Sequence, residues 1–268
     1  MSTPSAATNV ARTGTVSAAV GLGRRSVMNL TRLPSAFLPS VAMPIFQAVA
    51  FSGTFFAIIR IPGFPTDRSI NWYLPLAVIM GCGFAGIGLG FAMIRDLENG
   101  FYDRLRMTPV SRWALILGPL LSALVRAVLV TTIVVIVGFI AGARLTHGAI
   151  GLLPLYISGI GMAVIGSGWS LGLAYRFRDM RAAAIMQLTF FLALFLSNAQ
   201  TPLFIIEGWL EPVARINPFT NVLRLARLGF LDPDITWNDT WGGLLALAVL
   251  SAFALVFART GLEKLDDG

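Results

Sequence analysis

The spacing of glycines between Gly81 and Gly86 could serve nucleotide chemistry, because Gly-x-Gly-x-x-Gly loops bind the pyrophosphate of dinucleotides. Such a loop must follow a strand and open a helix, whereas this one lies inside a long uncharged apolar run. Gly86 and Gly90 are also four residues apart, as are Gly168 and Gly172, which is the spacing that lets membrane helices pack closely. We therefore interpret these glycines as packing positions.

The side chains needed for the common catalytic motifs are missing from this sequence. A P-loop requires lysine followed by serine or threonine, but the only lysine, Lys264, precedes leucine. His147 is the only histidine, so neither a histidine-based metal cluster nor a Ser-His-Asp arrangement can form. Cys82 is the only cysteine and is expected to be a packing residue. We predict a non-catalytic chain that binds no metal and no cofactor of its own.

The composition indicates a polytopic membrane protein. Hydrophobic residues make up 56% of the 268 residues and charged residues only 12%, against about 25% charge in soluble domains. A membrane-spanning helix needs about 20 apolar residues, and six stretches are long enough. They are Leu33–Ile59, Ser69–Ile94, Trp113–Ala143, Leu145–Tyr175, Ala182–Ile206 and Thr240–Ala258. Because no two-residue alternation suggests a β-barrel, we predict an all-α fold with six transmembrane helices.

The distribution of positive charge predicts the orientation. With six spans, the side that holds both termini carries thirteen of the 20 Lys and Arg residues, and the other side carries six. Both termini are therefore predicted to be cytosolic. The expected organisation is a cytosolic segment with an interfacial helix (1–32), a transmembrane domain (33–259) and a cytosolic tail (260–268). Arg outnumbers Lys nineteen to one, which indicates a GC-rich, actinobacterium-like bacterial genome. The basic residues form no block, so nucleic-acid binding is not expected.

Two connections stand out by length and composition. The cytosolic segment 95–112 is densely charged and is punctuated by Asn99-Gly100 and Pro109. The outer segment 207–239 is far longer than a turn requires and contains prolines and tryptophans. We expect it to form short interfacial or re-entrant helices, where amphipathic rings are stable.

Arg126 is the one charge inside the third apolar stretch. If that stretch enters lipid near Leu115, Arg126 lies roughly 17 Å deep, at about 1.5 Å rise per residue. A charge that faces lipid there costs at least about 2.5–3.5 kcal/mol, so Arg126 should face the bundle, a subunit interface or a wet cavity. Candidate partners are helix-end carbonyls and four side chains, namely Gln47, Gln187, Asn198 and Glu207. Two interpretations remain open, a structural arginine that fixes helix packing and one that lines a path through the membrane.

Residues 95–112 read RDLENGFYDRLRMTPVSR. They resemble the cytosolic loop between spans two and three of ABC-2 type exporter permeases, within which the daunorubicin/doxorubicin-resistance branch is most similar. That family shows an acidic residue and glycine, then Arg-Leu, then Thr-Pro-x-Ser-Arg. The run Asn217-Pro218-Phe219-Thr220, followed by Leu223-Arg224, resembles the family's Asn-Pro-x-Thr element before the last span. Arg32-Leu33-Pro34 also fits, and the resemblance covers nearly the whole chain.

The resemblance implies a type V exporter transmembrane domain that works by alternating access. Two permease chains, identical or paralogous, would join two separate subunits that bind ATP and Mg²⁺. Segment 95–112 would then form the coupling helix that contacts the ATP-binding subunit; alternatively, it is a solvated loop whose arginines only enforce topology. The residues implied to carry the coupling are Glu98, Phe101, Asp103, Arg104 and Arg106.

The resemblance also implies a central path lined by spans one, two and five of each chain. Besides Arg126, its polar points would be Gln47, Thr54, Gln187 and Asn198. Its aromatic lining would be Phe46, Phe51, Phe55, Phe56, Phe84, Phe190, Phe191 and Phe195. Such a lining suits export of a drug, secondary metabolite or lipid across the bacterial plasma membrane, and hence multidrug efflux and antibiotic resistance.

Other functions remain open. Within the same fold, the chain could export a lipid-linked polysaccharide or cell-wall polymer. From other classes, it could be a stand-alone secondary transporter or channel, or a membrane scaffold. The six apolar stretches contain no Asp or Glu, and ion-coupled transporters commonly place a carboxylate at mid-membrane, which disfavours the secondary transporter.

Overall fold

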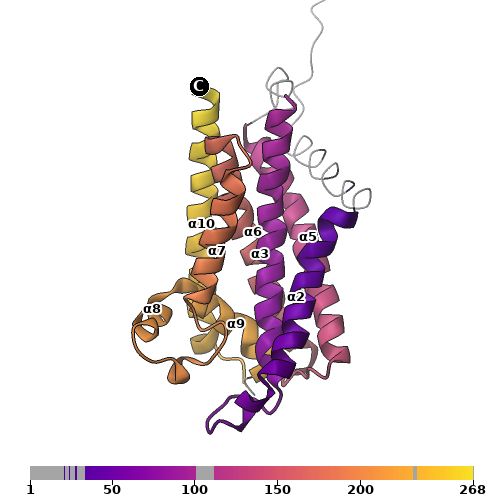
Figure 1. Ribbon diagram of the computed structural model, residues 1–268, viewed down its shortest axis with the longest axis vertical. Coiled ribbons are helices and arrows are strands. Elements are labelled where there is room, and N and C mark those ends of the chain that lie inside the picture. The colour runs from indigo at the N-terminus through magenta and orange to yellow at the C-terminus, as the bar shows by residue number, and fades with distance from the viewer. Residues whose placement is uncertain are drawn as a thin grey trace, which may run out of the picture.

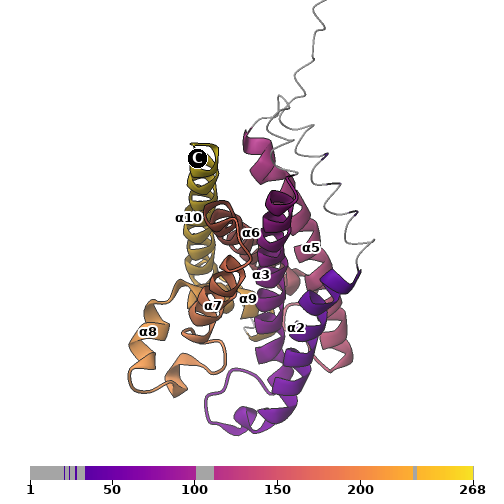
Figure 2. The ribbon, with the colours of Figure 1, turned by 45° about the horizontal axis from the view of Figure 1, so that its top comes forward.

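The computed structural model describes residues 34–100, 112–231 and 234–267, together with Gly21, Arg24 and Met28, and this part of the chain is helical without strands. The long helices run side by side in both ribbon views, and the C-terminus lies at one end of the bundle, opposite α8 and α9 (Figure 1, Figure 2). The α-helices are α2 (Pro34–Thr54), α3 (Ser69–Glu98), α5 (Arg112–Ile140), α6 (Leu152–Phe177), α7 (Ala182–Phe195), α8 (Leu210–Ile216), α9 (Pro218–Leu231) and α10 (Trp237–Asp267). Short 3-10 turns occur at η1 (Phe56–Arg60), η2 (Gly148–Gly151) and η3 (Leu203–Ile205).

Among the described residues, four helices are long and apolar enough to cross a membrane. They are Ser69–Glu98, Ile116–Ile140, Gly148–Phe177 and Trp237–Leu265, and two shorter apolar helices occur at Val41–Thr54 and Ala182–Phe195. The all-helical membrane architecture is therefore as predicted, while the count of six spans and the side of the termini stay predictions. Helix α10 continues through residue 260, the expected start of the tail, to Asp267.

The fifth apolar stretch is not one continuous helix as predicted. Helix α7 has 14 residues and ends at Phe195, so it measures only about 21 Å. The chain then turns through residues 196–202 and reaches Pro202, which has no N–H to continue a helix. Hydropathy alone did not separate the helix from this apolar turn.

Helix α3 lies at the centre of the bundle and is buried along most of its length. Its glycines permit very close contact with α6: a Cβ added to Gly86 would lie 2.5 Å from the Ala163 carbonyl oxygen, and one on Gly90 would lie 2.5 Å from the Ser170 Cβ. Gly168 of α6 makes an equally close approach to Ala254 of α10. These contacts confirm that the glycine pairs are packing positions.

Helices α3 and α5 pack antiparallel. Successive contacts along the two helices show this direction. A Cβ on Gly138 of α5 would overlap Leu74 of α3, and further along the Cys82 sulfur lies 3.4 Å from the Thr131 hydroxyl oxygen. Cys82 is fully buried, so its predicted packing role is confirmed. Further still along the same contact, Arg126 of α5 lies opposite Gly88 of α3.

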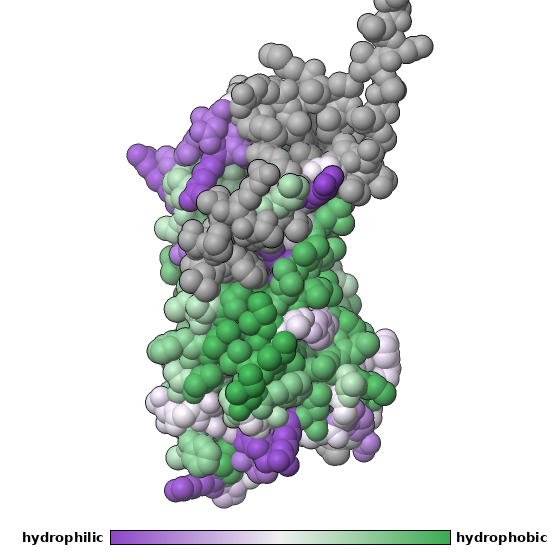
Figure 3. Space-filling model, turned by 90° about the vertical axis from the view of Figure 1, so that its right-hand side faces the viewer, coloured by the Kyte–Doolittle hydropathy of each residue, from purple (hydrophilic) through white to green (hydrophobic). Residues whose placement is uncertain are grey.

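The surface supports a membrane location. On the face shown in Figure 3, a broad apolar band crosses the middle of the molecule, with polar residues above and below it. Large apolar side chains are exposed along α5 and α10, including Ile136, which is 53% exposed, and Phe253, which is 60% exposed. Exposing so much apolar surface to water would cost free energy, whereas contact with apolar lipid tails would not.

Candidate functional site

The segment implied to carry coupling begins where α3 ends. Glu98 is the last residue of α3 and is exposed, at the same end of the bundle as the C-terminus. The Asn99 and Gly100 amides donate to the carbonyls of Arg95 and Leu97, and Gly100 has a positive φ of 62°. Glycine tolerates this conformation, so it stops the helix as the sequence indicated. Phe101, Asp103, Arg104 and Arg106 lie outside the described residues.

The predicted polar points of the path are scattered over the bundle. Gln47 is half-buried on α2, Thr54 is exposed at the end of α2, and Gln187 is exposed on α7. Asn198 is buried in the turn after α7. In the part of the chain that the structure describes, Arg126 has no hydrogen bond to any of its candidate partners, which were Gln47, Gln187, Asn198 and Glu207. Its Nε is buried without a hydrogen-bond partner.

The predicted aromatic lining divides into two groups. Phe84 of α3 packs against Phe190 and Phe191 of α7, with ring centroids 5.4 and 5.0 Å away. By contrast, Phe46 of α2 is 69% exposed. Other exposed members are Phe55, Phe56 and Phe195. The structure therefore joins α3 to α7 through rings and leaves exposed phenylalanines on α2, in the following η1 turn and at the end of α7.

Behind that aromatic contact lies an apolar groove of about 200 Å³ between α6, α7, α9 and α10. Phe190 and Phe219 line it from α7 and α9, and Phe253 lines it from α10. Its polar contact is a hydrogen bond of 2.9 Å from the Trp169 indole to the Thr189 hydroxyl. An apolar segment of a ligand could occupy this groove, which has few polar groups to fix an orientation.

The sequence analysis missed the role of Arg227. Arg227 is one of the six positive charges assigned above to the side opposite the termini, yet it is only 2% exposed. Its guanidinium donates to the carbonyls of Asn198 and Ala199, at 3.1 and 2.8 Å, and to that of Trp72, at 3.3 Å. One charged group thus satisfies carbonyls from the end of α7 and from α3. The sequence held one indication of this burial: Arg227 is four residues after the apolar Leu223, and this spacing places both on one face of α9.

The Asn-Pro-x-Thr run joins α9 to the ends of α7 and α8. The Asn217 carboxamide donates to the Ala193 carbonyl of α7 at 2.7 Å, while its oxygen accepts the Phe219 amide at 2.9 Å, as an N-cap does. Pro218 follows at the first helical position, where its missing N–H has no cost. The Thr220 hydroxyl donates to the Ala214 carbonyl of α8 at 2.6 Å.

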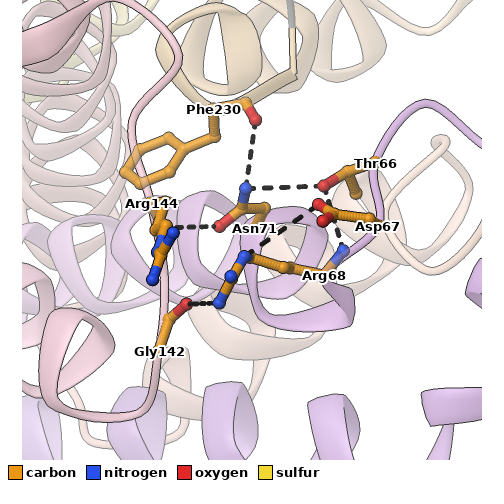
Figure 4. Close-up of polar contacts among 7 residues, drawn as sticks. All are labelled: Thr66, Asp67, Arg68, Asn71, Gly142, Arg144 and Phe230. Atoms are coloured by element: carbon orange, nitrogen blue, oxygen red, sulfur yellow. Dashed lines mark hydrogen bonds and ion pairs between the residues drawn. The ribbon is translucent and has the colours of Figure 1, made fainter.

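A second polar cluster ties the other end of α9 to α3 and to the α5–α6 connection (Figure 4). The buried Asn71 donates to the Phe230 carbonyl at 3.2 Å and accepts from the Arg144 amide at 3.0 Å. Arg68 donates to the Gly142 carbonyl at 2.9 Å and lies beside Asp67. Helix α9 is therefore pinned at both ends, although it lies in a connection.

The profile of the ABC-2 type transporter family matches residues 19–231 of this sequence. The chain belongs to the ABC-2 type transporter family. The match includes the segment 95–112 and the Asn-Pro-x-Thr run, which carried the resemblance noted above. An ABC-2 protein is a multi-pass membrane permease that works with an ABC ATP-binding subunit, and the apolar helices here agree with that role.

The curated relatives are distant in sequence. The putative transport permease ycf38 of Pyropia yezoensis is 26% identical over 252 residues, covering 85% of this chain and 84% of that protein. The probable multidrug ABC transporter permease YbhR of Escherichia coli (strain K12) is 26% identical over 205 residues, covering 70% and 55%. The daunorubicin resistance ABC transporter permease protein DrrB1 of Streptomyces coeruleorubidus is 24% identical over 227 residues, covering 83% and 78%.

Proposed function

We propose that this chain is the permease subunit of an ATP-driven exporter that moves hydrophobic or amphipathic compounds across a bacterial plasma membrane. The observation that carries the proposal is the family match over residues 19–231, together with relatives named as multidrug and daunorubicin resistance permeases. The apolar groove and the exposed phenylalanines of α2 and α7 support a lipophilic cargo.

In the proposed assembly, two permease chains, identical or paralogous, join two ATP-binding subunits that hold ATP and Mg²⁺. Both termini and segment 95–112 lie on the cytosolic side, where positive charge is concentrated. Helices α2 and α7 cross the membrane with the four longer helices. The 14 residues of α7 span about 21 Å, and the turn that follows covers the remaining depth.

Helix α3 is the element that can transmit movement between the two ends. Its 30 residues extend about 45 Å, from Glu98 beside the coupling segment to the level of α9. At the far end, the Trp72 carbonyl accepts from Arg227, and Asn71 donates to the Phe230 carbonyl. A push on the coupling segment would therefore reach α9 through a rigid helix and direct hydrogen bonds. Alternating access then requires that α3 and α9 move together.

The test is a mild-detergent pull-down of the tagged chain from its native membrane, with ATPase activity measured on the eluate. We expect a P-loop subunit to co-elute in equal amount, and Glu98→Lys or Asp103→Lys to abolish drug-stimulated hydrolysis without loss of the permease. Asp234→Lys is the matched control, because Asp234 is exposed and lies near the start of α10, at the opposite end of the bundle. If the chain elutes alone and turns over no nucleotide, the proposal is wrong and a stand-alone transporter has to be considered.

A further inference from the structure

Arg126 is a half-buried cation within the helix bundle, and it has no counter-charge among the residues that the structure describes. It lies at the midpoint of α5, about 21 Å from either end. Its Nε is buried and unpartnered, and no hydrogen bond or ion pair of Arg126 occurs among the described residues. The sequences of α2, α5, α6 and α7 contain no Asp or Glu, and the two acids of α3, Asp96 and Glu98, lie about 12 and 15 Å further along that helix than Gly88. An unpaired charge at such depth needs water or an anion beside it.

Space for such a partner exists on α3. A Cβ added to Gly88 would have Arg126 Nη1 at 3.9 Å as its only described neighbour within 4 Å, whereas Cβ atoms on Gly83, Gly86 and Gly90 would collide with other helices. The residue opposite Arg126 is therefore the one α3 glycine of this stretch that borders open space. The side chain of Arg126 is itself only half-buried.

The open face continues from Gly88 toward the Glu98 end of α3. Ala92 and Arg95 follow at helical spacing and are exposed. Arg95 lies about 10 Å further along the helix axis than Gly88. The two cations therefore mark one face of the bundle, from the end of α3 to a point about 15 Å inside it.

We propose that Gly88 and Arg126 form a binding site for the anionic head group, phosphate or carboxylate, of an amphipathic cargo. The inference rests on the proposed export function and narrows its substrate class to anionic amphiphiles. Arg95 attracts the head group at the membrane surface, Arg126 receives it inside the bundle, and Gly88 leaves the room that a side chain would fill. The apolar tail lies against the exposed apolar side chains of the bundle, and a cationic drug is repelled at the same place.

A cysteine placed at Gly88 reports the charge of this site directly. The native Cys82 is fully buried and gives little background reaction, and the space at Gly88 accommodates a side chain. In the purified complex we would compare the modification rates of the Gly88→Cys thiol by an anionic (sulfonatoethyl) and a cationic (trimethylammonioethyl) methanethiosulfonate. We expect the anionic reagent to be favoured, and Arg126→Gln to reduce that preference by about tenfold, because a unit charge about 4 Å away acts oppositely on the two reagents.

Two further variants separate Arg126 from its surroundings. Arg126→Lys keeps the charge and should retain the preference for the anionic reagent, while Arg95→Gln removes the other cation and should retain most of it. Co-elution of the ATP-binding subunit and a single symmetric gel-filtration peak check that each variant is folded. Failure of either reagent to react, or an unchanged preference in Arg126→Gln, would overturn the proposal.

Protection experiments identify the ligand class. Dodecyl phosphate should slow modification of the Gly88→Cys thiol, whereas dodecyltrimethylammonium with the same tail should not. Inorganic phosphate at the same concentration should protect at least about tenfold less; equal protection would indicate a site for free anions and would contradict an amphiphile site. Equal protection by both dodecyl compounds would also contradict it. The modification rates can be measured without transport. The anion site can therefore be disproved while the pull-down and ATPase assay support the exporter function, and the reverse also holds.

Discussion

The guanidinium of Arg227 lies 3.6 Å above the centre of the Trp72 ring and donates to the carbonyl of the same tryptophan. Trp72 belongs to α3, so this contact joins the connection helix α9 to the central helix of the bundle. The Trp72 indole donates in turn to the Gln200 carbonyl at 3.1 Å, in the turn that Arg227 also bonds. The three elements are therefore held by one buried cation and one aromatic side chain.

Replacing Arg227 should destabilise this end of the protein strongly. Arg227→Met keeps much of the side-chain volume but leaves three carbonyls without their donor, each at a cost of about 1–3 kcal/mol. Arg227→Lys should recover only part of the loss, because an ammonium lacks the planar fork that reaches carbonyls on two elements. The measurement is the apparent melting temperature of the detergent-purified protein by gel filtration.

Arg224→Met is the control for that pair of variants. Arg224 lies on the same helix and is exposed, and among the described residues its ion pair is with Asp239, at 3.5 Å. An exposed pair of this kind contributes about 0–1 kcal/mol. If Arg224→Met and Arg227→Met lower the melting temperature equally, the buried network is not what holds α9.

Asn71 should be sensitive to isosteric replacement. Asn71→Asp preserves the acceptor for the Arg144 amide but loses the donor to the Phe230 carbonyl and sets two oxygens against each other. We expect a loss of about 1–3 kcal/mol, seen as a lower melting temperature than that of Asn238→Asp, an exposed position at the start of α10. Equal stability of the two variants would show that the Figure 4 cluster does not hold α9.

Asn217 should have two separable roles. Asn217→Ser keeps an oxygen that can cap α9 but removes the donor to the Ala193 carbonyl of α7, whereas Asn217→Ala loses both. An N-cap contributes about 0.5–2 kcal/mol, so the melting temperature should fall in the order wild type, serine variant, alanine variant. Serine and alanine variants of equal stability would exclude a capping role.

The parts of this fold that depend on local sequence could be predicted, and those that depend on distant partners could not. The packing role of Gly86 and Gly90 and the helix stop at Gly100 follow from spacing and backbone freedom alone. The end of α7 at Phe195 did not follow, because the donor that caps its Ala193 carbonyl is Asn217, which hydropathy cannot bring there. Segment 207–239 contains the short helices α8 and α9, but the burial of Arg227 in α9 could not be predicted.

The same division applies to the candidate site. The charge of Arg126 within an apolar stretch identifies it from sequence alone, yet none of its suggested partners reaches it. Which side of each partner's helix or loop faces Arg126 depends on tertiary packing, which the sequence does not reveal. The residue that does lie opposite, Gly88, has no side chain and so no pattern by which to find it. The coupling residues were assigned by resemblance, and apart from Glu98 they lie outside the described residues.

The contact between α3 and α6 should tolerate no added atoms, which gives a direct test of the central packing. Gly86→Ala would place its Cβ 2.5 Å from the Ala163 carbonyl oxygen and 2.7 Å from the Ser167 amide nitrogen, both backbone atoms that cannot rotate away. Because α3 must separate from α6 to accept the methyl group, we expect the free energy of unfolding to fall by about 3 kcal/mol or more. That is the upper end of the range typical of overpacking, about 1–3 kcal/mol. Gly53→Ala is the matched control, since its Cβ near the end of α2 would meet nothing within 4 Å, and its stability should stay within about 0.5 kcal/mol of the wild type. Both variants would be compared by melting temperature and by membrane expression level, and a Gly86→Ala protein as stable as Gly53→Ala would contradict the close α3–α6 approach on which the transmission through α3 depends.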